Sequence, residues 1–108
     1  MQRTRTASMR IPDVSDVATW PASKINAALD RLDKLSSANT DDFINAGRGH
    51  ERPSEYLRAD RTDPLSRRAQ ELYSAESAIR YEINRRYGPG APSRLPRGFG
   101  PIKAPRYL

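Results

Sequence analysis

The sequence predicts an all-α protein: an antiparallel two-helix hairpin with an extended basic N-terminal arm and a Pro/Gly-rich C-terminal arm. Two segments of similar length carry apolar residues at intervals of three and four, which is the spacing of one helix face. Matching lengths and stripes favour two helices that pack in opposite directions. Residues 88–108 hold five of the nine Pro and four of the six Gly, and this composition excludes helix and central strand there.

The first helix is expected over about residues 21–46. Pro21 suits the first helical position, where its missing N–H costs nothing, with Thr19 or Trp20 at the cap. The stripe weakens over 37–40, so the helix either breaks there or continues, and Gly47 is a natural C-terminal stop. The apolar stripe consists of Ile25, Ala28, Leu29, Leu32, Leu35, Phe43 and Ala46.

The second helix has clear signals at both ends. Asp63 followed by Pro64 is an N-cap with proline at the first helical position. Arg85 and Arg86 lie in the last turn, where cations complement the helix dipole. The run 88–90, Gly-Pro-Gly, ends the helix. The stripe between these signals is Leu65, Ala69, Leu72, Ala75, Ile79 and Ile83.

The chain therefore divides into an extended N-terminal arm (1–18), a helical hairpin (19–87) and a Pro/Gly-rich C-terminal arm (88–108). The connector 47–62 is long for two adjacent helices, and loops of this length are commonly functional. Residues 53–57 are expected to form a short helical turn that places Tyr56 and Leu57 on the hairpin.

Charge is distributed unevenly along the chain. Residues 1–10 carry +3 and residues 88–108 carry +4, both without an acid, whereas 11–87 carry −1. Acid-free cationic ends on a nearly neutral body are typical of interaction tails rather than of one basic face.

The sequence argues against catalysis, metal binding and membrane insertion. The chain has no Cys and His50 is its single His, so a Ser-His or Cys-His catalytic unit is nearly excluded. His50 is expected to be a loop residue. Di-metal helical bundles use Glu-x-x-His, which is missing here. No stretch reaches the ~18 apolar residues of a membrane span. We expect no enzyme activity, no cofactor, no metal site and no membrane partner.

Association is expected for a physical reason. Leu, Ile, Val and Phe make up 18 of the 108 residues, which is few for a charged chain that must build a core. A lone hairpin buries one seam, and this rarely offsets the entropy of ordering the chain. Without disulfides or metal, the hairpin is expected either to form a homo-oligomer or to dock on a larger protein assembly.

The arms supply the candidate contact residues. Spaced anchors in the C-terminal arm, with one aromatic residue of the connector, predict a partner-binding surface formed by Arg94, Leu95, Arg97, Phe99, Ile102, Tyr107 and Tyr56. The alternative is nucleic-acid binding, in which cationic side chains of the arms neutralise phosphates. Its residues are Arg3, Arg5, Arg10, Arg94, Arg97, Lys103 and Arg106.

Two stretches, 47–55 and 86–96, resemble segments of small uncharacterised proteins of GC-rich bacteria and their tailed phages. The resemblance carries no catalytic motif and transfers no functional residue. It implies a phage or virion assembly, in which small helical proteins bridge larger subunits. The expected function is a non-enzymatic interaction or assembly protein, cytoplasmic, or virion-associated if the resemblance holds, with a nucleic-acid-binding accessory protein as the alternative.

Overall fold

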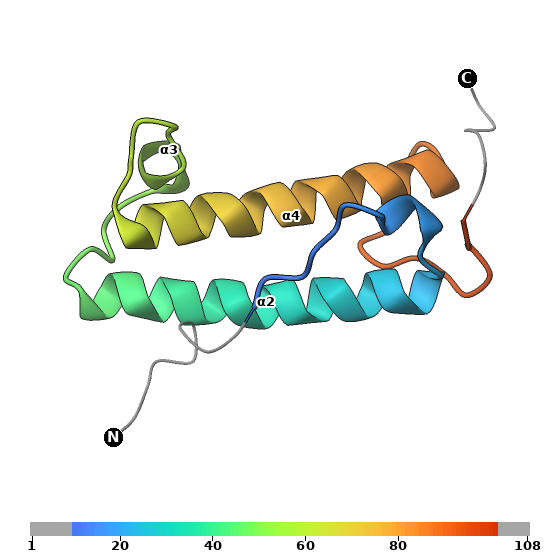
Figure 1. Ribbon diagram of the computed structural model, residues 1–108, viewed down its shortest axis with the longest axis horizontal. Coiled ribbons are helices and arrows are strands. Elements are labelled where there is room, and N and C mark those ends of the chain that lie inside the picture. The colour runs from blue at the N-terminus through green and yellow to red at the C-terminus, as the bar shows by residue number, and fades with distance from the viewer. Residues whose placement is uncertain (1–9, 102–108) are drawn as a thin grey trace.

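The computed structural model describes residues 10–101 of the chain. Over these residues the protein is all-helical and contains no strand. A short 3-10 helix, η1 (Val17–Thr19), precedes the long helix α2 (Ala22–Asn45), the short helix α3 (Pro53–Tyr56) and the second long helix α4 (Pro64–Tyr87) (Figure 1). The predicted all-α class is confirmed.

Helix α2 begins one residue later than the sequence predicts. Pro21 is the N-cap residue, with an extended ψ of 160°, and its carbonyl accepts hydrogen bonds from the backbone N–H groups of Lys24 and Ile25. Proline has no N–H group, so the N-cap residue itself adds no unsatisfied donor at this end of the helix. Trp20, directly before it, is only 4% exposed. Burial of the indole therefore fixes the path by which the chain enters α2.

Helix α2 continues through residues 37–40 without a break, and a glycine-containing C-terminal motif ends it. Gly47 has φ of 76°, the left-handed region that favours glycine. Its N–H donates to the carbonyl of Ile44 at 3.0 Å, and the N–H of Arg48 donates to the carbonyl of Phe43 at 2.8 Å. This pair of bonds is a Schellman motif, which satisfies the last carbonyls of the helix.

Helix α4 has the predicted boundaries. The Asp63 side chain accepts a hydrogen bond from the Ser66 N–H at 3.1 Å, and Pro64 opens the first turn. Gly88, with φ of 96°, follows the last helical residue. Local capping chemistry therefore fixes both ends. The predicted turn at 53–57 is also present, as helix α3.

The two long helices lie side by side, and the colour gradient runs in opposite directions along them (Figure 1). Their facing stripes form the centre of the hydrophobic core. Full burial of a Leu or Ile side chain contributes about 1.5–3 kcal/mol, so these layers dominate the stability of the helix pair. The most deeply buried members are Ile25, Leu29, Leu32, Leu35, Ile79 and Ile83.

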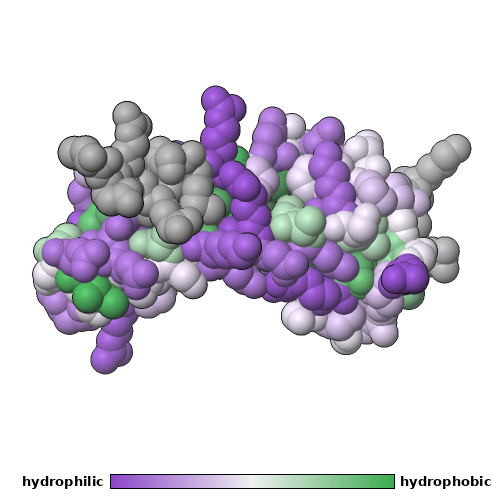
Figure 2. Space-filling model, turned by 90° about the horizontal axis from the view of Figure 1, so that it is seen from below, coloured by the Kyte–Doolittle hydropathy of each residue, from purple (hydrophilic) through white to green (hydrophobic). Residues whose placement is uncertain are grey.

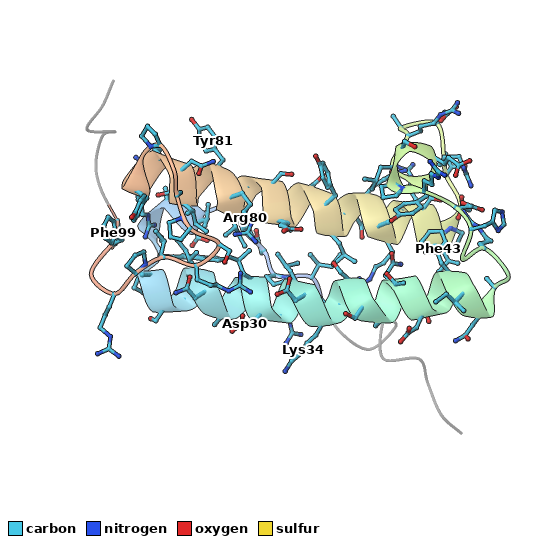
Figure 3. The ribbon with its side chains drawn as sticks, turned by 180° about the vertical axis from the view of Figure 1, so that it is seen from behind. Asp30, Lys34, Phe43, Arg80, Tyr81 and Phe99 are labelled. Carbon is cyan, nitrogen blue, oxygen red and sulfur yellow. The ribbon has the colours of Figure 1, made fainter. Side chains whose placement is uncertain are left out.

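The segments outside the long helices enlarge this core. Trp20 and Leu95 are both 4% exposed and belong to the same cluster, and partly buried side chains pack against it from residues 11–17 and 91–99. The N-terminal segment lies along Ser74 and Ala75 of α4. The C-terminal segment crosses the opposite side of the helix pair, as the view from behind shows (Figure 3). The core therefore extends beyond the seam between the two long helices.

Candidate interaction surface

A buried ion pair near the end of α4 holds both ends of the described chain. The Arg86 side chain is 0% exposed and the Glu82 side chain 3% exposed, and Nε of Arg86 donates to Oε2 of Glu82 at 2.7 Å. Other guanidinium nitrogens of Arg86 donate to three backbone carbonyls. These belong to Val17 at 3.0 Å, Ala18 at 3.3 Å and Phe99 at 3.2 Å. We call Glu82, Arg86 and these three carbonyls the terminal clasp.

The charge state of Glu82 follows from its partners. Burial raises the pKa of this carboxyl, but hydrogen bonds from Arg85 and Arg86 outweigh burial, and the pKa lies below its ordinary value. Arg85 donates to both oxygens of Glu82, at 2.8 and 2.7 Å. Glu82 therefore stays ionised at neutral pH, although it is almost fully enclosed. The clasp makes Arg86 unavailable to a phosphate backbone in this conformation.

The start of the predicted C-terminal arm is tied to α2. The Asn26 side chain bonds twice to the backbone of Leu95: its Nδ2 donates to the Leu95 carbonyl at 3.0 Å, and its Oδ1 accepts from the Leu95 N–H at 2.9 Å. Arg94 donates to Asp30 at 2.9 Å and to Asp33 at 2.8 Å. Arg94 and Leu95 were both predicted to bind a partner. In the structure Leu95 is almost fully buried, and Arg94 forms ion pairs within the chain.

The remaining predicted partner-binding residues differ in exposure. Phe99 is half-buried and its ring lies 5.1 Å from that of Tyr87. The Tyr56 ring lies 4.7 Å from that of Phe43. Arg97 is exposed. Their role toward a partner stays a prediction, because each described contact is within the chain.

Several predicted residues lie outside the described part of the chain. For the partner surface these are Ile102 and Tyr107. For the nucleic-acid alternative they are Arg3, Arg5, Lys103 and Arg106. Arg10 is described and exposed, and its carbonyl accepts a hydrogen bond from Arg31 at 3.1 Å.

An ion-pair network organises the connector between α2 and α4. Arg48 donates to Glu51 at 2.7 Å and to Asp63 at 2.6 Å, and Arg61 donates to the same Glu51 at 2.9 Å. The hydrogen bonds from Arg48 lower the pKa of Glu51 to about 2 and also hold the pKa of Asp63 below its usual range. Because Asp63 caps α4, the network ties the end of α2 to the start of α4. His50 is exposed beside it.

The sequence reasoning missed a row of exposed tyrosines on α4. Tyr73 is 60% and Tyr81 71% exposed, on the side of α4 away from its buried stripe. In Figure 3 the Tyr81 side chain projects away from α2. Between the two rings lies a shallow hollow of about 450 Å³, which Glu76, Ser77, Arg80 and Asn84 complete. We call these six residues the tyrosine face.

The opposite side of the molecule is different in character. Figure 2 views the protein from below, where α2 forms much of the surface, and hydrophilic side chains cover most of the coloured area. Of the large hydrophobic side chains that are exposed in the described residues, Ile44 lies on α2, whereas Tyr73, Tyr81 and Tyr87 all lie on α4. Large aromatic exposure is thus concentrated on one helix.

Residues 10–101 contain neither a metal-binding cluster nor a helix suited to span a membrane. No group of three or more His, Asp or Glu side chains in this range is placed to hold a metal ion. None of the helices in the same range combines the length and the apolar character needed to cross a bilayer.

Comparison with known proteins gives no relative. No protein-family model matches this chain, and searches of curated proteins and of solved structures also found no match. The functional argument therefore depends on the chain's own surface.

Proposed function

We propose that this chain is a non-enzymatic interaction protein, a helical hairpin that docks on a larger assembly. The observation that carries the proposal is the tyrosine face, because Tyr73 and Tyr81 expose most of their side chains although the core behind them is already closed. Exposed tyrosine side chains beside an arginine are typical of a binding hot spot, which is enriched in Trp, Tyr and Arg.

The acid-free ends supply a second contribution. All 13 carboxylates lie between residues 11 and 87, so both ends of the chain are purely cationic. Such ends accelerate encounter with an acidic surface and orient the docked protein. A phage or virion assembly is the setting that the resemblance of segments 47–55 and 86–96 suggests.

Site-specific photo-crosslinking in the cell that makes the protein tests this proposal. A photoreactive phenylalanine is placed at Tyr81 and, in a second variant, at Arg97, with Lys34 as the control position. Lys34 is exposed on α2 and points away from α4 (Figure 3). We expect a discrete adduct with a larger protein at Tyr81 or Arg97 and a much weaker one at Lys34. Equal or absent adducts at all three positions would contradict the proposal.

The second candidate function is binding of nucleic acid through the cationic ends. It is favoured by Arg97, which is exposed in a segment without any acid. Phosphate contacts release counterions, so the affinity of the full chain for a 20-nucleotide duplex should fall steeply between 50 and 200 mM salt. An affinity that does not change with salt excludes this candidate.

A further inference from the structure

We propose that the tyrosine face is a self-association surface that binds the same face of a second copy of this chain. The inference goes beyond the proposed function by giving this face a second partner, another copy of the chain, and it rests on that function only in assigning a binding role to the face. Its evidence is the position, the charge and the order of the residues on the second half of α4.

The borders of the tyrosine face are set by the chain itself. Toward the start of α4 the connector and α3 cover the helix, where Gln70 Nε2 donates to the carbonyls of Tyr56, Arg58 and Arg61. Along one edge the C-terminal segment lies against Arg80, whose Nη1 donates to the Ser93 carbonyl at 2.6 Å. Tyr73 also borders a hollow shared with α3, yet it stays 60% exposed, and Tyr81 is 71% exposed. The face is therefore available without any rearrangement.

The order of residues on this face suits a two-fold interface. In a two-fold dimer the same patch serves both copies, so each residue type must meet its complement when the helix is reversed. Tyr73 and Tyr81 lie four positions before and after Ser77. When two α4 helices cross antiparallel at Ser77, Tyr73 of each copy meets Tyr81 of the other. The small Ser77 side chain at the crossing point permits close approach of the helices.

The charges on the face are also self-complementary. Glu76 and Arg80 form an i,i+4 pair with 3.5 Å between Oε2 and Nη2. With the crossing at Ser77, Glu76 of one copy lies two positions, about 3 Å along the helix axis, from Arg80 of the other, so each carboxylate approaches a guanidinium of the opposite copy. The chain as a whole carries +6 and repels its own copy. A neutral face is therefore the kind of surface through which such a chain associates with itself.

The area indicates a weak and reversible dimer. A tyrosine buries roughly 150–250 Å² when fully covered, so the exposed parts of Tyr73 and Tyr81 in two copies supply about 500 Å². The four smaller contributors of the face bring the total near the ~1,000 Å² at which specific interfaces begin. Because α3 stands at one end of the face, the second α4 must cross obliquely, as in the common packing class near −50°. We expect a dissociation constant on the order of 10–100 µM.

Sedimentation equilibrium of the full chain from 10 to 500 µM measures the association directly. We expect a monomer–dimer equilibrium for the wild type, at least tenfold weaker association for Tyr81→Ala, and no change for Ile44→Ala. Ile44 is the matched control because it is a large exposed apolar residue, 57% exposed, outside the face. A wild-type chain that stays monomeric up to 500 µM overturns the inference, as does a dimer that Tyr81→Ala leaves unchanged.

A cysteine at the crossing point tests the geometry. The described chain has no cysteine, and the sequence contains none elsewhere. Two Ser77 positions at a two-fold axis lie within the 4.4–6.8 Å Cα separation that a disulfide requires. Mild oxidation should therefore convert Ser77→Cys to a covalent dimer much faster than Ser37→Cys, which is exposed on α2. Equal rates would contradict the arrangement.

The two proposals fail separately. A monomeric chain that still crosslinks to a larger protein at Arg97 removes the self-association only. A chain that dimerises as expected, but gives no adduct with another protein, removes the docking function only.

Discussion

Removing the arginine of the terminal clasp should destabilise the whole molecule. Arg86→Met keeps the length and helix propensity of the side chain, and it removes the guanidinium that joins Glu82 to the carbonyls of residues 17, 18 and 99. Deleting one partner of a buried ion pair costs about 3–5 kcal/mol, because the other charge stays enclosed. Glu82 keeps its ion pair with Arg85 at 2.7 Å, so the free energy of unfolding should fall by about 3–4 kcal/mol.

This loss is large relative to the total stability of a small domain. Domains of this size unfold at a free-energy cost of about 5–15 kcal/mol, and each kcal/mol shifts Tm by roughly 4–8 °C. We therefore expect the Tm of Arg86→Met to fall by roughly 12–32 °C at pH 7. Circular dichroism at 222 nm follows the helices, and the emission of Trp20, which is 4% exposed next to the clasp, follows the packing at that end.

Two further variants make the result interpretable. Arg67→Met removes an exposed arginine from the same helix and should change the free energy of unfolding by less than about 0.5 kcal/mol. Arg86→Lys keeps the charge but not the planar fork that reaches several acceptors, and it should lie between the wild type and Arg86→Met. An Arg86→Met protein that melts within 2–3 °C of the wild type would refute the role assigned to the clasp.

Three further predictions concern other features that stabilise the fold. Asn26→Ala removes both bonds to Leu95, so residues 91–99 should be cleaved faster by protease while the helices stay intact by circular dichroism. Gly47→Ala should lower stability by about 1 kcal/mol in urea unfolding, because φ is 76° although space for the methyl group is open. The pKa of Glu51 is lowered to about 2 in the folded chain, so the stability it adds is fully present above pH ~4.5 and is lost as the pH falls toward 2. The fall in the urea midpoint between pH 6 and pH 3 should therefore be smaller in Glu51→Gln than in the wild type.

The sequence predicted the elements whose ends depend on local chemistry. An Asp-Pro pair and a glycine mark the two ends of α4, and each acts within one helical turn, so no tertiary knowledge was needed. The start of α2 was misplaced by one residue because Pro21, whose ψ is an extended 160°, stands at the N-cap and not at the first helical position. The burial of Trp20 directly before it is a tertiary contact with no local signal.

The clasp was missed because charged residues were assigned to the solvated flank. Glu82 and Arg86 occupy positions on the side of α4 that also carries Ile79 and Ile83, and an i,i+4 Glu–Arg pair beside such a stripe was the available signal. The periodicity of apolar residues does not reveal a buried pair of charged residues whose partners are backbone carbonyls.

The sequence predicted that the chain has a binding surface, but it did not identify the residues of the tyrosine face. The predicted binding residues were isolated apolar and cationic side chains. The sequence does not show whether an isolated apolar side chain packs on the chain's own helices or on a partner. In the structure Leu95 covers the chain's own helices. Tyr73 and Tyr81 received no role because they fall outside both apolar stripes. Large aromatic residues on the polar side of a helix were nevertheless the signal for a binding face.

On α4, the residues that stabilise the fold are different from the residues of the proposed dimer surface. The Glu82 and Arg86 side chains are buried in the molecule, whereas those of Tyr73 and Tyr81 are exposed on its surface. Effects at sites without shared partners add independently. Below its lowered Tm, Arg86→Met should therefore dimerise like the wild type, whereas Tyr81→Ala should keep the wild-type Tm in dilute solution and lose the dimer. If Tyr81→Ala instead lowered the Tm of the monomer, its ring would belong to the fold, and an intramolecular role would replace the binding face.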